Sequence, residues 1–116
     1  MNIEIVNIYK AKPDFYCGRG SALGNPFRLE DTNDNAQRDH VCDQYEAYFI
    51  DQVVVKRNQS MLRQLAKIKQ KLVKDGTVKL GCFCAPKRCH CETIKEYVLK
   101  DLKDNKEIKG LENAGD

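Results

Sequence analysis

Cysteine and histidine side chains are concentrated in one short stretch of this chain. Four of the six cysteines and one of the two histidines lie in residues 82–91, which read CFCAPKRCHC. Thiolates and imidazoles bind zinc, and they also act as nucleophiles and bases in catalysis. This stretch, named here the cysteine corner, therefore predicts either a metal site or a reactive thiol, and each hypothesis assigns its own residues.

The metal hypothesis rests on ligand number and spacing. A tetrahedral zinc site takes four cysteines, or three cysteines and one histidine. Cys82 and Cys84 are two residues apart in an expected strand, so their side chains should point to the same side. Together with the adjacent Cys89 and His90 they complete a set of four, and we expect zinc if this corner binds a metal. Whether the protein uses any other cofactor stays open.

The catalytic hypothesis rests on the start of the helix that should follow the corner. Cys89 lies near that start, beside His90, Lys87 and Arg88. A positive helix end and neighbouring cations lower a thiol pKa and favour the reactive thiolate. The candidate catalytic residues are accordingly Cys84, Cys89 and His90. A third interpretation treats the strand cysteines as small core residues, a common role for buried cysteine.

A second segment combines glycines with polar side chains. Residues 18–27 read GRGSALGNPF and are named here the glycine-rich loop. Glycines allow tight turns and a close approach of the backbone to a ligand, and exposed N–H groups favour anions. The candidate ligand-binding residues of this loop are Arg19, Gly20, Ser21, Gly24 and Asn25.

Apolar alternation and turn signals predict the strands that carry these two segments. Residues 2–9 form an expected central strand, and residues 15–17 form a short one directly before the glycine-rich loop. Residues 78–84 form the strand that enters the cysteine corner, where Ala85 and Pro86 end it.

Helical periodicity predicts the remaining elements. A first long helix, capped by Asp31, Thr32 or Asn33, has an apolar face; its members are Val41, Tyr45, Tyr48, Phe49 and either Val53 or Val55. A second helix begins near Asn58 or Ser60, buries Met61, Leu65, Ile68 and Leu72, and ends at Gly76. Ile94, Tyr97, Val98 and Leu102 form the apolar face of a third helix.

This order of elements predicts one small α/β domain over residues 1–103, followed by a flexible C-terminal tail over residues 104–116. Two helices between the early strands and the last strand supply a crossover. The expected sheet is short, mixed or parallel, with about three strands covered by about three helices. Ligands of such sheets lie at the carboxyl ends of the strands. Both the glycine-rich loop and the cysteine corner follow strands, so we expect them to share one pocket.

The charge distribution indicates a second surface. The net charge is +3, but Glu30 to Asp51 holds seven acidic residues and one arginine, whereas Gln52 to Lys74 holds seven basic residues and no acidic one. Arg63, Lys67, Lys71 and Lys74 line one face of the second helix. Such a face is either solvated or contacts nucleic acid or a host protein. No apolar run is long enough to span a bilayer, which predicts a cytoplasmic protein without membrane contact; the oligomeric state stays open.

The two motifs together resemble those of a widespread family of short bacteriophage and bacterial proteins that is catalogued as a domain of unknown function. The family pattern combines an RGxxLGNPF loop with a CxCxPxxCH corner, and the resemblance covers roughly residues 1–102. The resemblance implies that the positions of this chain matching the two family motifs form its functional or structural core. These positions are Arg19, Gly20, Leu23, Gly24, Asn25, Pro26, Phe27, Cys82, Cys84, Pro86, Cys89 and His90. At position 91 the family pattern has a small residue, whereas this chain has Cys91. Cys91 is therefore a weaker ligand candidate. A phage origin would place the protein in the bacterial host cytoplasm.

These observations lead to two functional hypotheses. In the first, the glycine-rich loop and the cysteine corner form a polar pocket for a phosphate-bearing or nucleotide-like small molecule, with catalysis as an open question. In the second, the protein is not an enzyme but a zinc-stabilised module that binds nucleic acid or a host protein through its basic helix.

Overall fold

The computed structural model describes residues 1–28, 30–31, 33–85 and 87–114, with side chains as far as Asp104. The described chain is an α/β structure in which three strands form one sheet beside three α-helices. The elements follow one another as β1 (Asn2–Asn7), β2 (Phe15–Tyr16), α1 (Asn35–Ile50), the π-helical segment η1 (Asp51–Val55), α2 (Gln59–Asp75), β3 (Thr77–Cys82) and α3 (Cys91–Ala114).

The sheet is parallel throughout, with β3 between β1 and β2, so β1 is an edge strand and not the central strand expected from its apolar residues. Ile5 of β1 and Phe15 of β2 both pair with Leu80 of β3. Parallel neighbours require a long crossover, and α1, η1 and α2 supply it between β2 and β3. The α/β prediction is thus confirmed, and the alternative of a mixed sheet is resolved in favour of a parallel one. All strands end at the same edge of the sheet.

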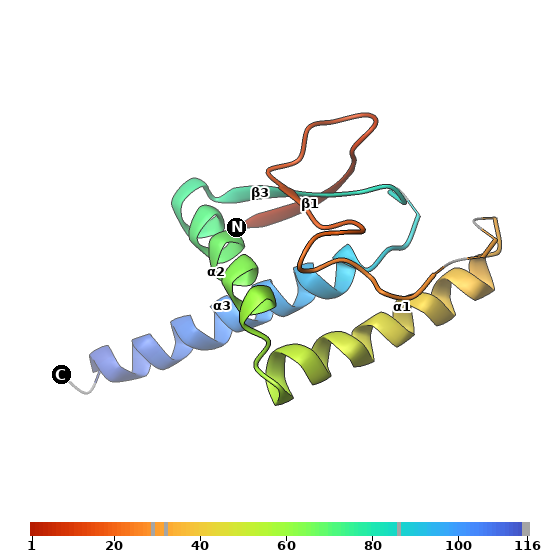
Figure 1. Cartoon of the computed structure of the whole chain (residues 1–116). Coiled ribbons are helices and arrows are strands. Elements are labelled where there is room, and N and C mark those ends of the chain that lie inside the picture. The colour runs from red at the N-terminus through yellow and green to blue at the C-terminus, as the bar shows by residue number, and fades with distance from the viewer. Residues whose placement is uncertain (29, 32, 86, 115–116) are drawn as a thin grey trace.

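The helices cover the sheet through the apolar faces that their periodicity predicts. Figure 1 shows α1 and α3 on the same side of the strands, while α2 leads directly into β3. The predicted positions on α2 are fully buried, namely Met61, Leu65, Ile68 and Leu72. On the first helix Val41, Tyr45 and Phe49 are buried, Tyr48 is partly buried, and Val53 of η1 is buried whereas Val55 is 70% exposed. Of the two candidates, Val53 therefore belongs to the core and Val55 does not.

Several element ends differ from the sequence prediction because side chains bond locally. Asp34 caps α1 by accepting from the Gln37 N–H, while Asp31 forms its own turn with the N–H of Asn33. Asn33 is not the cap either, and Thr32, the remaining candidate, lies outside the described residues. The cap of α2 is Asn58, as expected, and Gly76 ends that helix in a left-handed conformation with φ of 80°.

The first and last strands are shorter than the apolar pattern indicates. β1 ends at Asn7, whose side chain accepts a hydrogen bond from the Tyr9 N–H and starts a turn. β3 ends at Cys82, two residues before its predicted end. This early end matters for the site, because the alternation of side chains no longer applies beyond Cys82.

Helix α3 continues to Ala114, well past the boundary at residue 103 that the loss of periodicity indicates. Most of the segment expected to be a tail is therefore helical, and residues 115–116 lie outside the described part. Flexibility of this segment stays a prediction. Among the described residues, no helix has the length and apolar character needed to cross a membrane.

Candidate functional site

A pocket of about 480 Å³ lies where the glycine-rich loop meets the cysteine corner. The two segments are about sixty residues apart in the sequence, and the parallel sheet brings them to one edge. The described lining residues are Asn7; Gly18, Arg19, Asn25 and Phe27 from the loop; Arg38, Val41 and Cys42 from α1; and residues 82–85 and 87–90 from the corner.

The glycine-rich loop is held against both the sheet and α1. The Cys17 N–H donates to the Gly81 carbonyl, and the Tyr45 hydroxyl donates to the Leu23 carbonyl at 2.8 Å. Burial raises the pKa of Tyr45, so its hydroxyl stays protonated as a donor. Leu23 itself is fully buried. The loop is therefore a fixed wall of the pocket.

Only some of the predicted ligand-binding residues face this pocket. Arg19 and Asn25 line it, whereas Gly20, Ser21 and Gly24 are not among its lining residues. These three shape the loop instead. The Ser21 hydroxyl donates to the Gly18 carbonyl, and a Cβ on Gly24 would lie 2.5 Å from that carbonyl oxygen.

Asn7 holds the cysteine corner in place, a role that the sequence analysis did not assign. Its Nδ2 donates to the carbonyl of Phe83 at 3.2 Å and to that of Ala85 at 3.0 Å. These bonds tie the end of β1 to the loop after β3. The visible signal in the sequence is an amide residue near the end of an expected strand, where parallel sheets position polar groups.

Arg88 also supports the corner. Its guanidinium pairs with Asp39 at 3.2 Å, with Asp43 at 3.0 Å and with Glu92 at 3.7 Å. The two carboxylates of α1 raise its pKa further above its usual range. Arg88 is thus committed to binding α1 and α3 and contributes little free charge to the pocket.

Arg38 is a second residue of the pocket that sequence reasoning missed. It is only 6% exposed, and its Nη1 donates to the Arg88 carbonyl at 3.5 Å. The signal was present, because Arg38 is the single basic residue of an otherwise acidic segment. It also precedes Val41 and Tyr45 by three and seven residues, which places it on the core face of α1.

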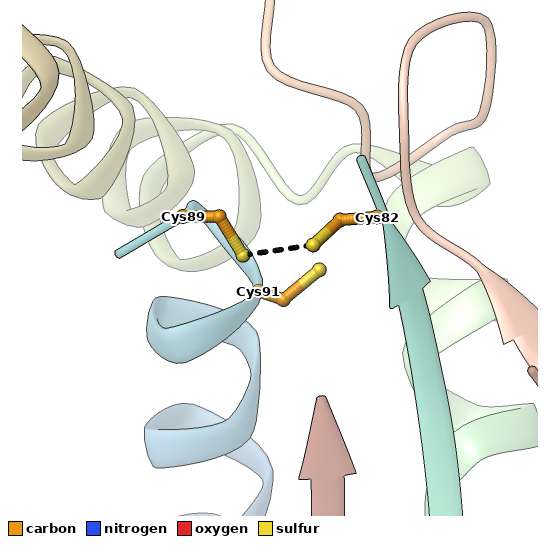
Figure 2. Close-up of side chains that lie close together, drawn as sticks. All are labelled: Cys82, Cys89 and Cys91. Atoms are coloured by element: carbon orange, nitrogen blue, oxygen red, sulfur yellow. Dashed lines mark hydrogen bonds between the residues drawn. The ribbon is translucent and has the colours of Figure 1, made fainter. Parts of the chain in front are cut away.

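Three cysteine sulfurs converge beside the pocket, as Figure 2 shows. Cys82 at the end of β3, Cys89 before α3 and Cys91 at the start of α3 have sulfur atoms within 4.8 Å of one another, with 3.2 Å between Cys82 and Cys89. All three are buried. Sulfurs at this separation could hold a metal ion.

This cluster differs from the ligand set that the sequence predicts. Cys84 and His90 are not in it, whereas Cys91, the weaker candidate, is. The reason is the early end of β3, because Cys84 lies in the following turn and not on the same side of the strand as Cys82. Among the described residues, no other group of three metal-binding side chains is this close.

The distribution of protons among these thiols also differs from the prediction. A lowered pKa was expected for Cys89, but its pKa is raised, chiefly by its hydrogen bond with Cys82. The lowered pKa belongs to Cys82, which accepts hydrogen bonds from the thiols of Cys89 and Cys91 and from two backbone N–H groups. The helix start therefore does not make Cys89 the thiolate of the corner.

His90 is buried on the pocket wall, and its Nε2 hydrogen-bonds to the Cys17 carbonyl. Because a carbonyl only accepts, Nε2 carries the proton and Nδ1 holds the lone pair when the ring is neutral. Burial lowers the pKa of His90, which keeps the ring neutral near pH 7. Its ring also meets the Tyr45 ring edge-on, with 5.0 Å between centroids.

The basic face of α2 lies apart from this pocket, since none of its four residues is among the lining residues. Arg63, Lys67 and Lys74 are exposed. Lys71 pairs with Asp75 at 2.6 Å and lies 3.9 Å from Asp14. Three of the four predicted nucleic-acid residues thus present their charge to solvent.

A domain of unknown function (DUF4326) matches residues 6–100, which is most of the chain. The protein belongs to the DUF4326 family. The match includes both motifs and every residue of the pocket, so the pocket lies inside the DUF4326 domain. The phage origin implied by the resemblance stays a prediction. No curated protein and no solved structure matches the chain.

Proposed function

We propose that this DUF4326 protein binds a phosphate-bearing, nucleotide-like small molecule in the pocket between the glycine-rich loop and the cysteine corner. The observation that carries this proposal is the charge of the pocket wall. Three cationic side chains besides the carboxylate-paired Arg88 line it, namely Arg19, Arg38 and Lys87, and none of its described lining residues carries a carboxylate. A concave site with one sign of charge concentrates ligands of the opposite sign.

The cations differ in what they offer to such a ligand. Arg38 is buried, so an anion beside it would lie partly shielded from water, where charge-assisted hydrogen bonds are strong. Arg19 and Lys87 are exposed at the mouth. The amide of Asn25 adds a polar group, although its Oδ1 already accepts from the Phe27 N–H at 2.8 Å.

The volume and the apolar part of the wall favour a ligand larger than phosphate alone. Pockets of roughly 300–1,000 Å³ accommodate small molecules and cofactors, and this one measures about 480 Å³. Phe27, Val41 and Phe83 line it beside the cations. An aromatic base or another flat apolar group would contact these side chains while its phosphate met the arginines.

Catalysis in this pocket is a narrower hypothesis. Cys84, Cys89 and His90 all line the wall, and Cys84 is the most exposed of the three. A catalytic role would use the Cys84 sulfur or Nδ1 of His90, because the Cys89 thiol is engaged with Cys82 and Nε2 of His90 with Cys17. Turnover of a bound nucleotide that stops on Cys84→Ser would support it.

Isothermal titration calorimetry with nucleoside mono-, di- and triphosphates and with inorganic phosphate tests the binding proposal. Arg19→Gln should weaken binding about 10- to 100-fold, because a hydrogen bond to a charged group contributes about 1.5–3 kcal/mol. Arg63→Gln changes the net charge equally on the distant helix α2 and should leave affinity nearly unchanged. Absence of binding to every compound, or equal weakening by both variants, would contradict the proposal.

The alternative function is a metal-stabilised module that contacts nucleic acid or a host protein through Arg63, Lys67, Lys71 and Lys74. The three exposed cations on α2 support it, together with the thiol cluster that could hold zinc. The pairing of Lys71 with Asp75 reduces the charge that this face presents. Binding of nucleic acid that survives Arg19→Gln but not substitution on α2 would favour this function.

A further inference from the structure

We propose that Cys82, Cys89 and Cys91 bind one zinc ion at the wall of the pocket, and that the fourth position of this ion is open to the pocket and holds a water molecule. This ligand set differs from the one predicted from the cysteine corner, because it includes Cys91 and excludes Cys84 and His90. The zinc ion would belong to the candidate site itself, since two of its ligands line the pocket.

The positions of the three sulfur atoms fit a zinc site. Cys82 ends β3, Cys89 lies just before α3 and Cys91 begins α3, and Figure 2 shows their side chains directed toward one another. Zinc–sulfur bonds of about 2.3 Å in a tetrahedron place the sulfurs roughly 3.8 Å apart. The three sulfurs lie within 4.8 Å of one another, and those of Cys82 and Cys89 are 3.2 Å apart. The separation that zinc requires falls between these two values, so small side-chain rotations would suffice to bind it.

The chemistry of the ligands and of the pocket wall selects the metal. Soft sulfur ligands favour zinc and other thiophilic ions over magnesium and calcium, which take oxygen ligands. The described residues that line the pocket include no carboxylate. One zinc ion and three thiolates carry a net charge of −1, and the three displaced protons pass to solvent. Arg19, Arg38 and Lys87 line the same pocket and would offset that charge.

Among the described residues, no fourth cysteine, histidine or carboxylate joins this group of sulfurs. Cys84 is partly exposed in the turn after β3. His90 directs its Nε2 to the Cys17 carbonyl, and the Cys17 sulfur hydrogen-bonds to the Phe15 carbonyl at 3.8 Å. The geometry thus provides three protein ligands, and a tetrahedral zinc ion bound by them takes its fourth ligand from outside the chain.

The pocket is the space from which that fourth ligand would reach the ion. Cys82 and Cys89 are among its lining residues, whereas Cys91 is not and is fully buried. Structural zinc sites have four protein ligands, whereas three protein ligands and one position for water or substrate are typical of zinc sites that act on a ligand. A molecule in the pocket would replace the water by one of its own donor atoms. This last step rests on the proposed function, whereas the binding of zinc does not.

X-ray absorption spectroscopy of the unsubstituted protein, loaded with one equivalent of zinc under reducing conditions, tests the ligand set directly. We expect three sulfur neighbours at about 2.3 Å and one oxygen neighbour at about 2.0–2.2 Å. Four sulfur neighbours would overturn the open position. The outer-shell signal of an imidazole ring would overturn the proposal in favour of a site containing His90, and absence of bound zinc would overturn it altogether.

The variants Cys91→Ser and Cys84→Ser distinguish the two ligand sets. Loss of an outer hydrogen-bond partner typically lowers metal affinity 10- to 100-fold, so loss of the direct ligand Cys91 should lower it at least about 100-fold in competition with a chromogenic chelator. Unchanged affinity of Cys91→Ser would overturn the assignment. Cys84→Ser should keep its affinity and its three sulfur neighbours. Because Cys84 is partly exposed, this variant should fold even if Cys91→Ser does not, and a lost sulfur neighbour in it would also overturn the assignment.

Cobalt(II) in place of zinc reports the open position through its visible absorption. Imidazole, a neutral donor, should displace the bound water and shift the visible bands of the unsubstituted protein. Unchanged bands up to the imidazole concentration that begins to remove the cobalt would overturn the open position. These measurements use no phosphate compound, so their outcome is distinguishable from failure of the anion-binding proposal.

Discussion

His90 joins the cysteine corner to the glycine-rich loop, because its Nε2–H donates a hydrogen bond to the carbonyl of Cys17, 73 residues earlier in the chain. The same ring packs edge-on against Tyr45, whose hydroxyl holds Leu23 of that loop. His90 thereby connects the two walls of the pocket.

We expect His90→Ala to destabilise the fold by about 1–3 kcal/mol, since it leaves the buried Cys17 carbonyl without its donor. Urea denaturation followed by circular dichroism measures this loss. His40→Ala is the matched control, because His40 is exposed on α1 and its removal should change the free energy of unfolding by less than about 0.5 kcal/mol. Equal stability of the two variants would show that the bond to Cys17 contributes nothing.

The glycine-rich loop should be intolerant of a side chain at Gly24. A Cβ there would lie 2.5 Å from the Gly18 carbonyl oxygen, which is backbone and cannot rotate away. We expect Gly24→Ala to cost about 1–3 kcal/mol, as overpacking does elsewhere, and to weaken ligand binding by displacing Arg19 and Asn25.

Gly20→Asn is the control for this loop. Gly20 has φ of 89° but no atom within 4 Å of an added Cβ, and asparagine tolerates positive φ better than most residues. Thermal unfolding should therefore show a smaller loss for Gly20→Asn than for Gly24→Ala. A larger loss at Gly20 would mean that conformational strain, and not the contact with Gly18, limits this loop.

If the basic face of α2 contacts a nucleic-acid backbone, the salt dependence of the affinity should reflect the number of exposed cations on this face, which is three. If Arg63, Lys67 and Lys74 each contact one phosphate of duplex DNA, a plot of log affinity against log salt concentration should have a slope of roughly −2.7. Fluorescence anisotropy across a salt series measures this slope, and Lys74→Gln should make it shallower by about 0.9. Absence of binding to duplex and single-stranded nucleic acid at low salt would rule this function out.

The pair Lys71–Asp75 at the end of α2 should make a small, pH-dependent contribution to stability. The hydrogen bond from Lys71 lowers the pKa of the Asp75 carboxyl. A carboxyl whose pKa is lower in the folded state stabilises the fold above its unfolded pKa, and that contribution disappears as the pH falls through the folded value.

NMR titration of the Asp75 side chain checks this expectation. Lys71→Met should return the pKa of Asp75 towards its ordinary value, and the stability of this variant should approach that of the unsubstituted protein in acid. An unchanged pKa in Lys71→Met would show that the pair does not form in solution. It would also free Lys71 for the nucleic-acid face.

The sequence by itself determined the elements and their order, because these depend on local patterns. The buried face of α2 follows from a helical repeat that is visible in Met61, Leu65, Ile68 and Leu72. Gly76 as the end of α2 follows from the conformational freedom of glycine at positive φ. The meeting of Arg19 and Asn25 with Cys84 and His90 in one pocket also followed from sequence, through the rule that parallel strands end at one edge.

Only the tertiary structure decided which thiols meet and which groups complete the pocket. β3 ends at Cys82, and Asn7 bonds to the carbonyls of Phe83 and Ala85 in the turn that follows. Cys84 lies in that turn and outside the cluster, whereas Cys91 belongs to it. The pairing of β2 with β3 also places Cys17, directly after β2, where its N–H bonds to the Gly81 carbonyl. Such contacts depend on side-chain directions between segments far apart in the chain, and no local period encodes them.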